Sequence, residues 1–397
     1  MKNYYLHHHH KIQLGKIIHS SLWRFDFSVW LHTFARSLVS IFIPILMLTK
    51  GYQIKDVALF YLIYNIIDVP LNFFVGYFIQ KFNALAGIMV GNIAVISFFI
   101  ILSQVHEFTW SILLLLAFLA AVYDTFYWVS HLFIFMEVSA HHKNVGQETS
   151  MLDIVRQLGA LAGPAAGGAI LVFGNDFWLL LIASSLLIIS VFPLIGLKKV
   201  PTKPGNKEYS FKEMMKDPLS LRDHTSNILD SLHGAAEEFC FSIFIFTMFK
   251  SFESIAWLGD LASVAAIVFS YMIGSRASNY RSIFGFVGGL ALAGLWLSRV
   301  WVGNSLLLYL TAIGSGLFIR FITIPTDNSY FVNSRKIGPL QTSIYRNAFS
   351  MLPNIIFFLI MFIVSNVFTT GFSIAVGGMI CLALLNLRYM FVRDKKA

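Results

Sequence analysis

The stretch "RQLGALAGPAAGGAIL", from Arg156 to Leu171, decides the fold. It places three glycines four residues apart in an apolar run, with a proline among them. Glycine and proline are the two poorest helix formers, so such a run would be costly in a soluble helix. In lipid, glycines on one helix face let a second helix approach closely, and the proline can bend the helix. The stretch therefore predicts a tight, kinked helix–helix contact inside a membrane. Its packing residues are Gly159, Gly163, Pro164, Gly167 and Gly168.

The composition of the whole chain is that of a membrane protein. Of its 397 residues, 57% are hydrophobic and 12% are charged, which is roughly half the charged share of a soluble domain. The mean hydropathy is +0.71. The two cysteines lie far apart in apolar runs, so they predict neither a disulfide framework nor a metal centre. No nucleophile–base pair, phosphate loop or metal-ligand spacing appears, so the sequence predicts no enzyme and no cofactor.

Twelve apolar segments are long enough to cross a bilayer, which needs about 20 residues for a hydrocarbon layer of about 30 Å. The predicted spans cover residues 25–49, 56–79, 84–104, 108–138, 148–173, 177–197, 224–249, 255–275, 283–302, 305–332, 341–366 and 371–391. The sequence thus predicts an all-α integral membrane protein with twelve transmembrane helices.

Lysines and arginines predict the orientation, because cytoplasmic loops carry an excess of both. With the N-terminus inside, only Lys50, Lys55 and Lys250 fall in outer loops, so both termini are expected in the cytoplasm. The net charge of +9 then reflects topology and needs no nucleic-acid partner. One long basic loop divides the spans six plus six. The predicted parts are a tail (1–24), a six-helix bundle (25–197), a linker (198–222), a second bundle (223–392) and a tail (393–397).

The two halves repeat each other weakly. "WLHTFARSLVSIFI" (30–43) parallels "SLHGAAEEFCFSIFI" (231–245), and this sets Arg36 against Glu237. "VGQETSMLDIVRQ" (145–157) parallels "IGPLQTSIYRN" (337–347) at the start of the fifth span of each half. Two pseudo-symmetric six-helix bundles with a substrate site between them are a recurrent transporter plan.

The motif "GALAGPAAGG" (159–168) in the fifth of twelve spans resembles the G-x-x-x-G-P-x-x-G-G signature of the major facilitator superfamily, often called the antiporter motif. The resemblance covers the whole chain. It implies the major facilitator fold, with spans 1, 4, 7 and 10 lining a central cavity, and secondary transport by rocker-switch alternating access. The resemblance also points to proton-coupled antiport or efflux as the mode of transport.

Two other family motifs are degenerate in this chain. The loop clasp after the second span is represented by "GYFIQKFNAL" (76–85), where Gly76 and Lys81 fit but Gln80 replaces the acid. Its second copy, "GSRASNYRS" (274–282), is weaker still. The arginine motif that the family's proton-coupled drug exporters carry in span 4 is absent from "AAVYDTFYWVSHLFIF" (120–135). These departures weaken the inference of proton-driven drug export and leave the fold untouched.

Ionisable groups inside spans are costly in lipid, so each is a candidate functional residue. The candidates for substrate binding or coupling are Arg36, Asp124, Glu237, Arg320, His32, His131, His233, Asp68 and Trp128. The repeat predicts two pairs across the cavity, Arg36 with Glu237 and Asp124 with Arg320. The candidates for a cytoplasmic gate are Gly76, Lys81, Asp153, Arg156 and Arg346.

The sequence leaves the substrate open. Arginines inside the spans suit an anion, whereas the carboxylates suit a cation or coupling to H⁺. The alternatives are a lipid or lipophile translocator on the same fold, a metal-ion exporter using His32, Asp124, His131 or His233, and a non-transporting sensor. The expected partners are a small-molecule substrate of unknown class, protons as coupling ion, and membrane lipid. The chain is expected to be a monomer in a bacterial cytoplasmic membrane, with no resident metal.

Overall fold

A computed structural model of the chain describes residues 21–139, 145–195, 215–274, 276, 279–301 and 305–393, and its regular elements there are all helical. Twelve helical segments in these residues are long and apolar enough to cross a membrane, which confirms the predicted number. We number these spans 1 to 12 in chain order. Almost all of the predicted tails (1–24 and 393–397) and most of the predicted linker (198–222) lie outside the described residues.

Spans 1 to 6 form the N-terminal half. They contain α2 (Ser21–Ser37), η1 (Ser40–Phe42), α3 (Ile43–Thr49), α4 (Ile54–Lys81), α5 (Ala84–Gln104), α6 (Trp110–Ser139), α7 (Val145–Ala160), α8 (Gly163–Phe173), α9 (Asp176–Val191) and η2 (Phe192–Leu194). Spans 7 to 12 form the C-terminal half. They contain α11 (Pro218–Ala235), η3 (Ala236–Phe241), α12 (Ser242–Phe249), α13 (Phe252–Gly274), α14 (Arg281–Trp301), α15 (Ser305–Phe318), α16 (Arg320–Ile337), α17 (Pro339–Ile363) and α18 (Val367–Arg393).

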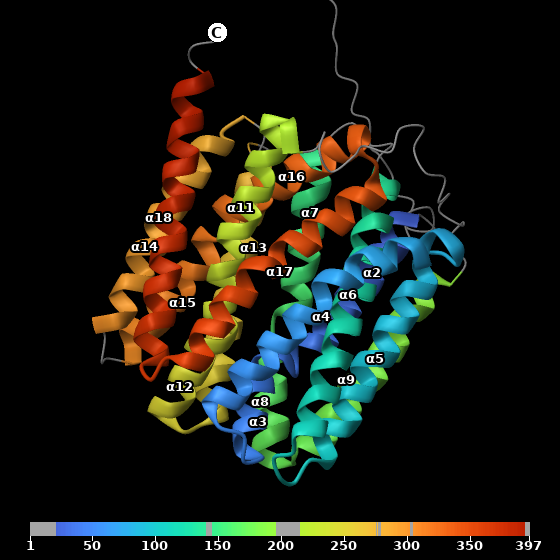
Figure 1. The fold of residues 1–397 in the computed structure, drawn as a ribbon, viewed down its shortest axis with the longest axis vertical. Helices are drawn as coiled ribbons and strands as arrows, with labels where there is room; N and C mark the ends of the chain where they lie inside the picture. The colour runs from blue at the N-terminus through green and yellow to red at the C-terminus, as the bar shows by residue number, and fades with distance from the viewer. Residues whose placement is uncertain are drawn as a thin grey trace, which may run out of the picture.

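The two halves lie side by side, the first drawn from blue to green and the second from yellow to red in Figure 1. They meet where α4 packs along α17 and where α7 and α8 pack along α13. Each half contains six apolar membrane-spanning helices. The fold is therefore the predicted pair of pseudo-symmetric six-helix bundles.

Four spans are interrupted near mid-length. Span 1 breaks between α2 and η1, and span 10 breaks at Ile319, so that Arg320 begins α16. Span 5 breaks inside the glycine motif, where Ala162 has a left-handed φ of 64° and Pro164 lies in the first turn of α8. Span 7 contains a π-helical stretch, η3, which carries Glu237 and Glu238. Such π stretches often mark functional sites, and the interruptions of spans 1, 7 and 10 fall beside Arg36, Glu237 and Arg320.

Span 7 begins earlier than its predicted start at residue 224. The side chain of Asp217 accepts a hydrogen bond from the backbone N–H of Leu219, and Pro218 occupies the first helical position. Both are strong helix-start features. Hydropathy alone did not predict this first turn, because residues 218–223 are largely polar and a polar helix end has the composition of a loop.

Candidate functional site

The glycine motif packs against both halves. An added Cβ at Gly159 would lie 2.6 Å from the carbonyl oxygen of Trp30, and one at Gly167 would collide with the carbonyl oxygen of Leu38. On another side of the same helix, a Cβ at Gly168 would lie 3.0 Å from the Cβ of Ala256 in α13. The motif therefore lets span 5 press against span 1 within its own half and against span 8 of the other half.

A cavity of about 730 Å³ lies between the halves at the level of the helix breaks. Spans 1, 4 and 5 line it from one half, and spans 7, 8, 10 and 11 line it from the other. Spans 1, 4, 7 and 10 are those that the family resemblance implies. The ionisable side chains in its wall are Arg36, Asp124, Arg156, Asp230, His233, Glu237, Glu238, Arg320 and Arg346. Acids and bases from both halves thus face one space.

The predicted pair of Arg36 with Glu237 is wrong. Glu237 forms an ion pair of 2.9 Å with Arg299 of α14, in its own half. Arg299 is fully buried and lies 3.6 Å from the ring centre of Phe241. Arg36 lies 4.7 Å from the ring centre of Tyr123 and forms no ion pair with any described residue. The repeat predicts that Arg36 and Glu237 lie at one depth, but it carries no information about α14, which supplies the partner of Glu237.

The predicted pair of Asp124 with Arg320 is also wrong. Arg320 donates from Nη1 to Asp153 Oδ1 at 2.6 Å. Asp153 also accepts a hydrogen bond of 2.5 Å from the hydroxyl of Ser270. This ion pair still joins the two halves, because Asp153 belongs to α7 and Arg320 to α16. Asp153 lies near the start of span 5, whereas Arg320 begins α16 at the break in the middle of span 10.

Arg156 and Arg346, predicted as gate residues, stand in the wall of the central cavity. Arg346 pairs with Asp327 at 2.5 Å. Arg156 contacts His131 Nε2 at 2.7 Å and lies 5.2 Å from the ring centre of Trp128. Arg156 forms no ion pair with any residue that the structure describes. The cavity thus holds two arginines, Arg36 and Arg156, that rest on aromatic rings instead of carboxylates.

Asp124 belongs to a polar network that reaches both halves. Asp68 in α4 belongs to the same network through Asn72 and Asn347. Asn72 donates to Asp68 at 2.5 Å, and Asn347 of α17 donates to Asn72 at 2.9 Å. Asn347 also reaches Asp124 at 3.5 Å. Asp68 is fully buried and borders the seam between α4 and α17 instead of the cavity.

The three predicted histidines do not converge. His32 and His131 flank the Tyr127 ring at 3.6 and 5.4 Å, whereas His233 accepts a hydrogen bond from Trp296 at 2.8 Å. Within the described ranges, no group of three or more His, Cys, Asp and Glu residues is placed to hold a metal ion.

A smaller aromatic pocket opens beside Arg36, and we name it the side pocket. Its apolar wall is Ile43, Phe60, Tyr61, Tyr64, Val95, Phe98, Ala120 and Tyr123. Arg36, Asp124 and Glu238 line both this pocket and the central cavity. Tyr61 donates to Glu238 at 3.1 Å from across the halves. The two spaces therefore meet at one set of charged groups.

The two halves are also in contact on the side of the predicted cytoplasmic gate. Phe135 of α6 packs on Phe331 of α16 with ring centres 4.8 Å apart, and both rings are buried. Gly76 faces Ile344 of α17 so closely that a Cβ there would collide with it. Lys81 lies in the last turn of α4, 5.3 Å from the Phe82 ring centre, and makes no ion pair with a described residue.

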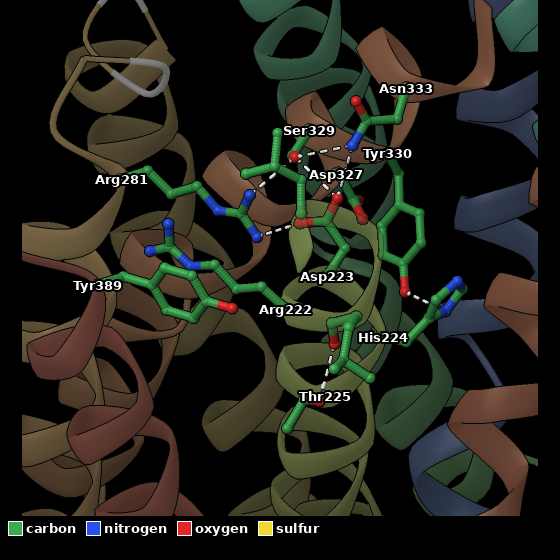
Figure 2. Close-up of polar contacts among 12 residues, drawn as sticks. Arg222, Asp223, His224, Thr225, Arg281, Asp327, Ser329, Tyr330, Asn333 and Tyr389 are labelled. Carbon is green, nitrogen blue, oxygen red and sulfur yellow. Dashed lines mark hydrogen bonds and ion pairs between the residues drawn. The ribbon is translucent and has the colours of Figure 1, made fainter. Parts of the chain in front are cut away.

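The weak second copy of the loop clasp supplies Arg281, whose role in the structure is clear. Figure 2 shows Arg281, Ser329 and Asn333 converging on the buried carboxylate of Asp223. Ser329 and Asn333 donate to it at 2.8 and 3.0 Å. The cluster ties α11, α14 and α16 together, so one end of the C-terminal half is held as a unit.

Four site residues were not singled out from the sequence: Asp230, Arg299, Asp327 and Asn347. Each lies inside a predicted span, so the rule that marks charged groups in lipid covers the first three. Asn347 carries no charge, and its place beside Asp124 follows only from the packing of α17 on α6 and α4.

Comparison with known proteins agrees with this architecture. The family model of the Major Facilitator Superfamily matches residues 25–249. A search of curated proteins found no match. The fold is similar to the crystal structure of the human organic anion transporter MFSD10 (TETRAN), with a TM-score of 0.66, 12% sequence identity, and coverage of 92% of this chain and 98% of that one. It is equally similar to a bacterial homologue of the iron transporter ferroportin in the outward-facing state, with a TM-score of 0.66, 15% identity, and coverage of 93% and 99%. The chain is an integral membrane protein that belongs to the Major Facilitator Superfamily.

Proposed function

We propose that the chain is a secondary active transporter that carries a small amphipathic organic solute through the central cavity by rocker-switch alternating access. The observation that carries this proposal is one cavity lined by ionisable side chains of both halves at the level of the helix breaks. A solute bound there contacts both bundles, so its binding can bias the way they tilt. The proposal includes proton-coupled antiport and involves no enzymatic step.

The two connected spaces support an amphipathic solute. A charged end would remain among Arg36, Asp124 and Glu238, which line both spaces. A ring would remain in the central cavity, whose wall includes Trp128 and Phe241, and a short apolar substituent of that ring would enter the side pocket of about 50 Å³. The two similar structures carry chemically different cargoes by their titles, so they support the fold and no particular substrate.

The remaining parts of the proposal concern the setting. We further propose that both termini lie in the cytoplasm of a bacterial cell and that the chain acts as a monomer. The moving units are then two bundles, residues 25–197 and residues 223–392, which the linker 198–222 joins. The positive charge of the inner loops and the pseudo-symmetric fold support this topology.

A thermal-shift screen of purified protein tests the substrate class. The ligands are a series with one aromatic ring and either an ammonium, a carboxylate, both or neither, beside simple metal salts and long-chain lipids. We expect a ring compound with a charged group to raise the melting temperature, because a ligand that binds only the folded state stabilises it. Stabilisation by metals alone or lipids alone would replace this substrate class with one of the alternatives.

Ala120→Leu makes the screen specific to the side pocket. The larger side chain fills the pocket without removing a charge, so the shift caused by a ring compound with a short apolar substituent should be reduced. Ala169→Leu on the exposed face of α8 is the matched control and should retain it. In proteoliposomes, Asp124→Asn should then abolish uphill transport of the same compound while expression stays normal.

Breaking the ion pair between Asp153 and Arg320 should shift the protein toward an inward-open state. The pair joins α7 to α16 and must separate when the halves part on that side. A half-buried pair contributes on the order of 1 kcal/mol, so Asp153→Asn should raise the open population about fivefold. Electron-paramagnetic-resonance distances between labels at Met151 and Val332, in a chain without other cysteines, measure this. Asp327→Asn breaks a pair inside one half and should leave the distribution unchanged.

A further inference from the structure

We propose that the solute is a zwitterion, with an ammonium group at one end of a ring and a carboxylate at the other, and that Arg156 binds the carboxylate. This deepens the proposed function and rests on it, because it names the charges of the solute and adds a second charged subsite to the central cavity. Asp124 binds the ammonium, and the ring lies on Trp128 between the two charges.

Arg156 stands in the cavity wall without a negatively charged partner. Its Nη2 lies 2.7 Å from Nε2 of His131, and its guanidinium lies 5.2 Å from the ring centre of Trp128. Its Nε has no hydrogen-bond partner among the described residues. By contrast, Arg320 and Arg346 in the same wall are each paired with an aspartate. A carboxylate beside Arg156 would supply the missing negative charge and accept hydrogen bonds from the guanidinium.

The charged groups where the cavity meets the side pocket have the opposite excess. They are Arg36, Asp124 and Glu238, which line both spaces. Arg36 lies against the ring of Tyr123 and forms no salt bridge to a described acid. Two acids and one base leave one negative charge in excess when all three are ionised. An ammonium group is therefore attracted to this end, and a second carboxylate is repelled.

The two subsites follow one face of α6, with an aromatic ring between them. Asp124 and Trp128 are four residues apart and both line the cavity, so they share a face of this helix. His131, which contacts Arg156, follows three residues after Trp128. The helix rises about 10 Å from Asp124 to His131. The two charges of the solute are therefore separated by the length of a ring and do not share one carbon atom.

The wall formed by the C-terminal half carries another acid, Asp230 of α11. Asp230 lines the same cavity, and its Oδ1 has no hydrogen-bond partner among the described residues. It does not belong to the row of Asp124, Trp128 and Arg156, all of which lie in the N-terminal half. Asp230 is the competing partner for the ammonium group, and substitutions separate the two acids.

Isothermal titration calorimetry of the purified full chain in lipid nanodiscs tests the charges of the solute. The three probes are para-(aminomethyl)benzoate, para-methylbenzoate, which lacks the ammonium group, and para-methylbenzylamine, which lacks the carboxylate. We expect the zwitterion to bind at least about tenfold more tightly than either singly charged probe, because each end adds a hydrogen bond to a charged group.

Equal or tighter binding of a singly charged probe, or no binding of the zwitterion, would overturn the inference. The proposed function would still stand if another charged ring compound raised the melting temperature in the thermal-shift screen. It would fail if none did, so the two failures are distinguishable.

Substitutions assign each charge to a residue. Arg156→Gln should weaken binding of the zwitterion to the level of para-methylbenzylamine and leave binding of that amine unchanged. Asp124→Asn should weaken it to the level of para-methylbenzoate and leave binding of that acid unchanged. The unchanged probe shows in each case that the variant is folded. Glu253→Gln, at an exposed position in the first turn of α13, is the matched control and should bind all three probes like the wild type.

Two outcomes would overturn the assignment of residues. The first is loss of the ammonium contribution in Asp230→Asn instead of Asp124→Asn. The second is loss of the preference for the zwitterion in Arg156→Lys, which keeps the positive charge and gives a result even if Arg156→Gln does not fold.

Discussion

Glu237→Ala should lower the melting temperature more than any other single change in the cavity. The substitution leaves the guanidinium of Arg299 without a counter-ion, although that side chain is fully buried between Phe241 and Trp296. An uncompensated buried charge costs about 3–5 kcal/mol. Differential scanning fluorimetry of purified protein measures the loss.

The double variant Glu237→Ala with Arg299→Met separates a charge effect from a packing effect. Replacing both partners removes the buried charge together with its counter-ion, so this protein should be more stable than Glu237→Ala alone. Thr311 and Ser315 accept hydrogen bonds from Arg299 at 3.0 and 2.9 Å, and Thr311 also donates to the carbonyl of Leu308 at 2.7 Å, a bond that the double variant keeps. Glu238→Ala, beside Glu237 but hydrogen-bonded to Tyr61, is the control. Equal stability of the single and double variants would show that the ion pair does not matter. A transport defect in Glu237→Gln must therefore be compared with its melting temperature before a coupling role is assigned.

Gly167→Leu should abolish folded protein. Even a Cβ at Gly167 collides with the backbone carbonyl of Leu38, which cannot turn aside as a flexible side chain would. Overpacking of a well-packed site costs about 1–3 kcal/mol, and a clash with backbone lies at or above the upper end. The separation of span 5 from span 1 would change along its whole length.

The yield of monodisperse protein after detergent extraction measures this effect. Gly294→Leu in α14 is the matched control, because a Cβ there meets nothing within 4 Å. Gly167→Ala should fall between the wild type and Gly167→Leu. A Gly167→Leu protein that is extracted and melts like the wild type would contradict the close packing of spans 1 and 5.

The number of spans and the fold were predictable, because the length of an apolar segment and its glycine pattern act within one helix. The partners of the charged residues were not. Arg299 and Glu237 are 62 residues apart in the sequence. They meet only because α14 turns one face toward η3. Spacing within a helix says which residues share its face, but the rotation of one helix against another depends on all their packing. The repeat brought Arg36 and Glu237 to one depth and missed the neighbour that Glu237 binds.

The glycine motif illustrates the same division. Its periodicity predicts the close approach, and the structure shows the approach to be to span 1 on one side and to span 8 on the other. The left-handed Ala162 that precedes α8 had no signal beyond the nearby proline. No sequence pattern marked Asn347, because the role of an uncharged amide in a membrane span depends on the residues that it contacts in the fold.

The π-helical stretch of span 7 has a consequence for the length of this chain. Between Ala236 and Phe241 the backbone accommodates one residue more than an α-helix would in the same rise. If the same residues were wound as an ordinary α-helix, the extra residue would turn all of α12 by about 100°. The outer face of the second bundle would then present other side chains to its neighbours, so the register of this span depends on a residue count and not on any one side chain.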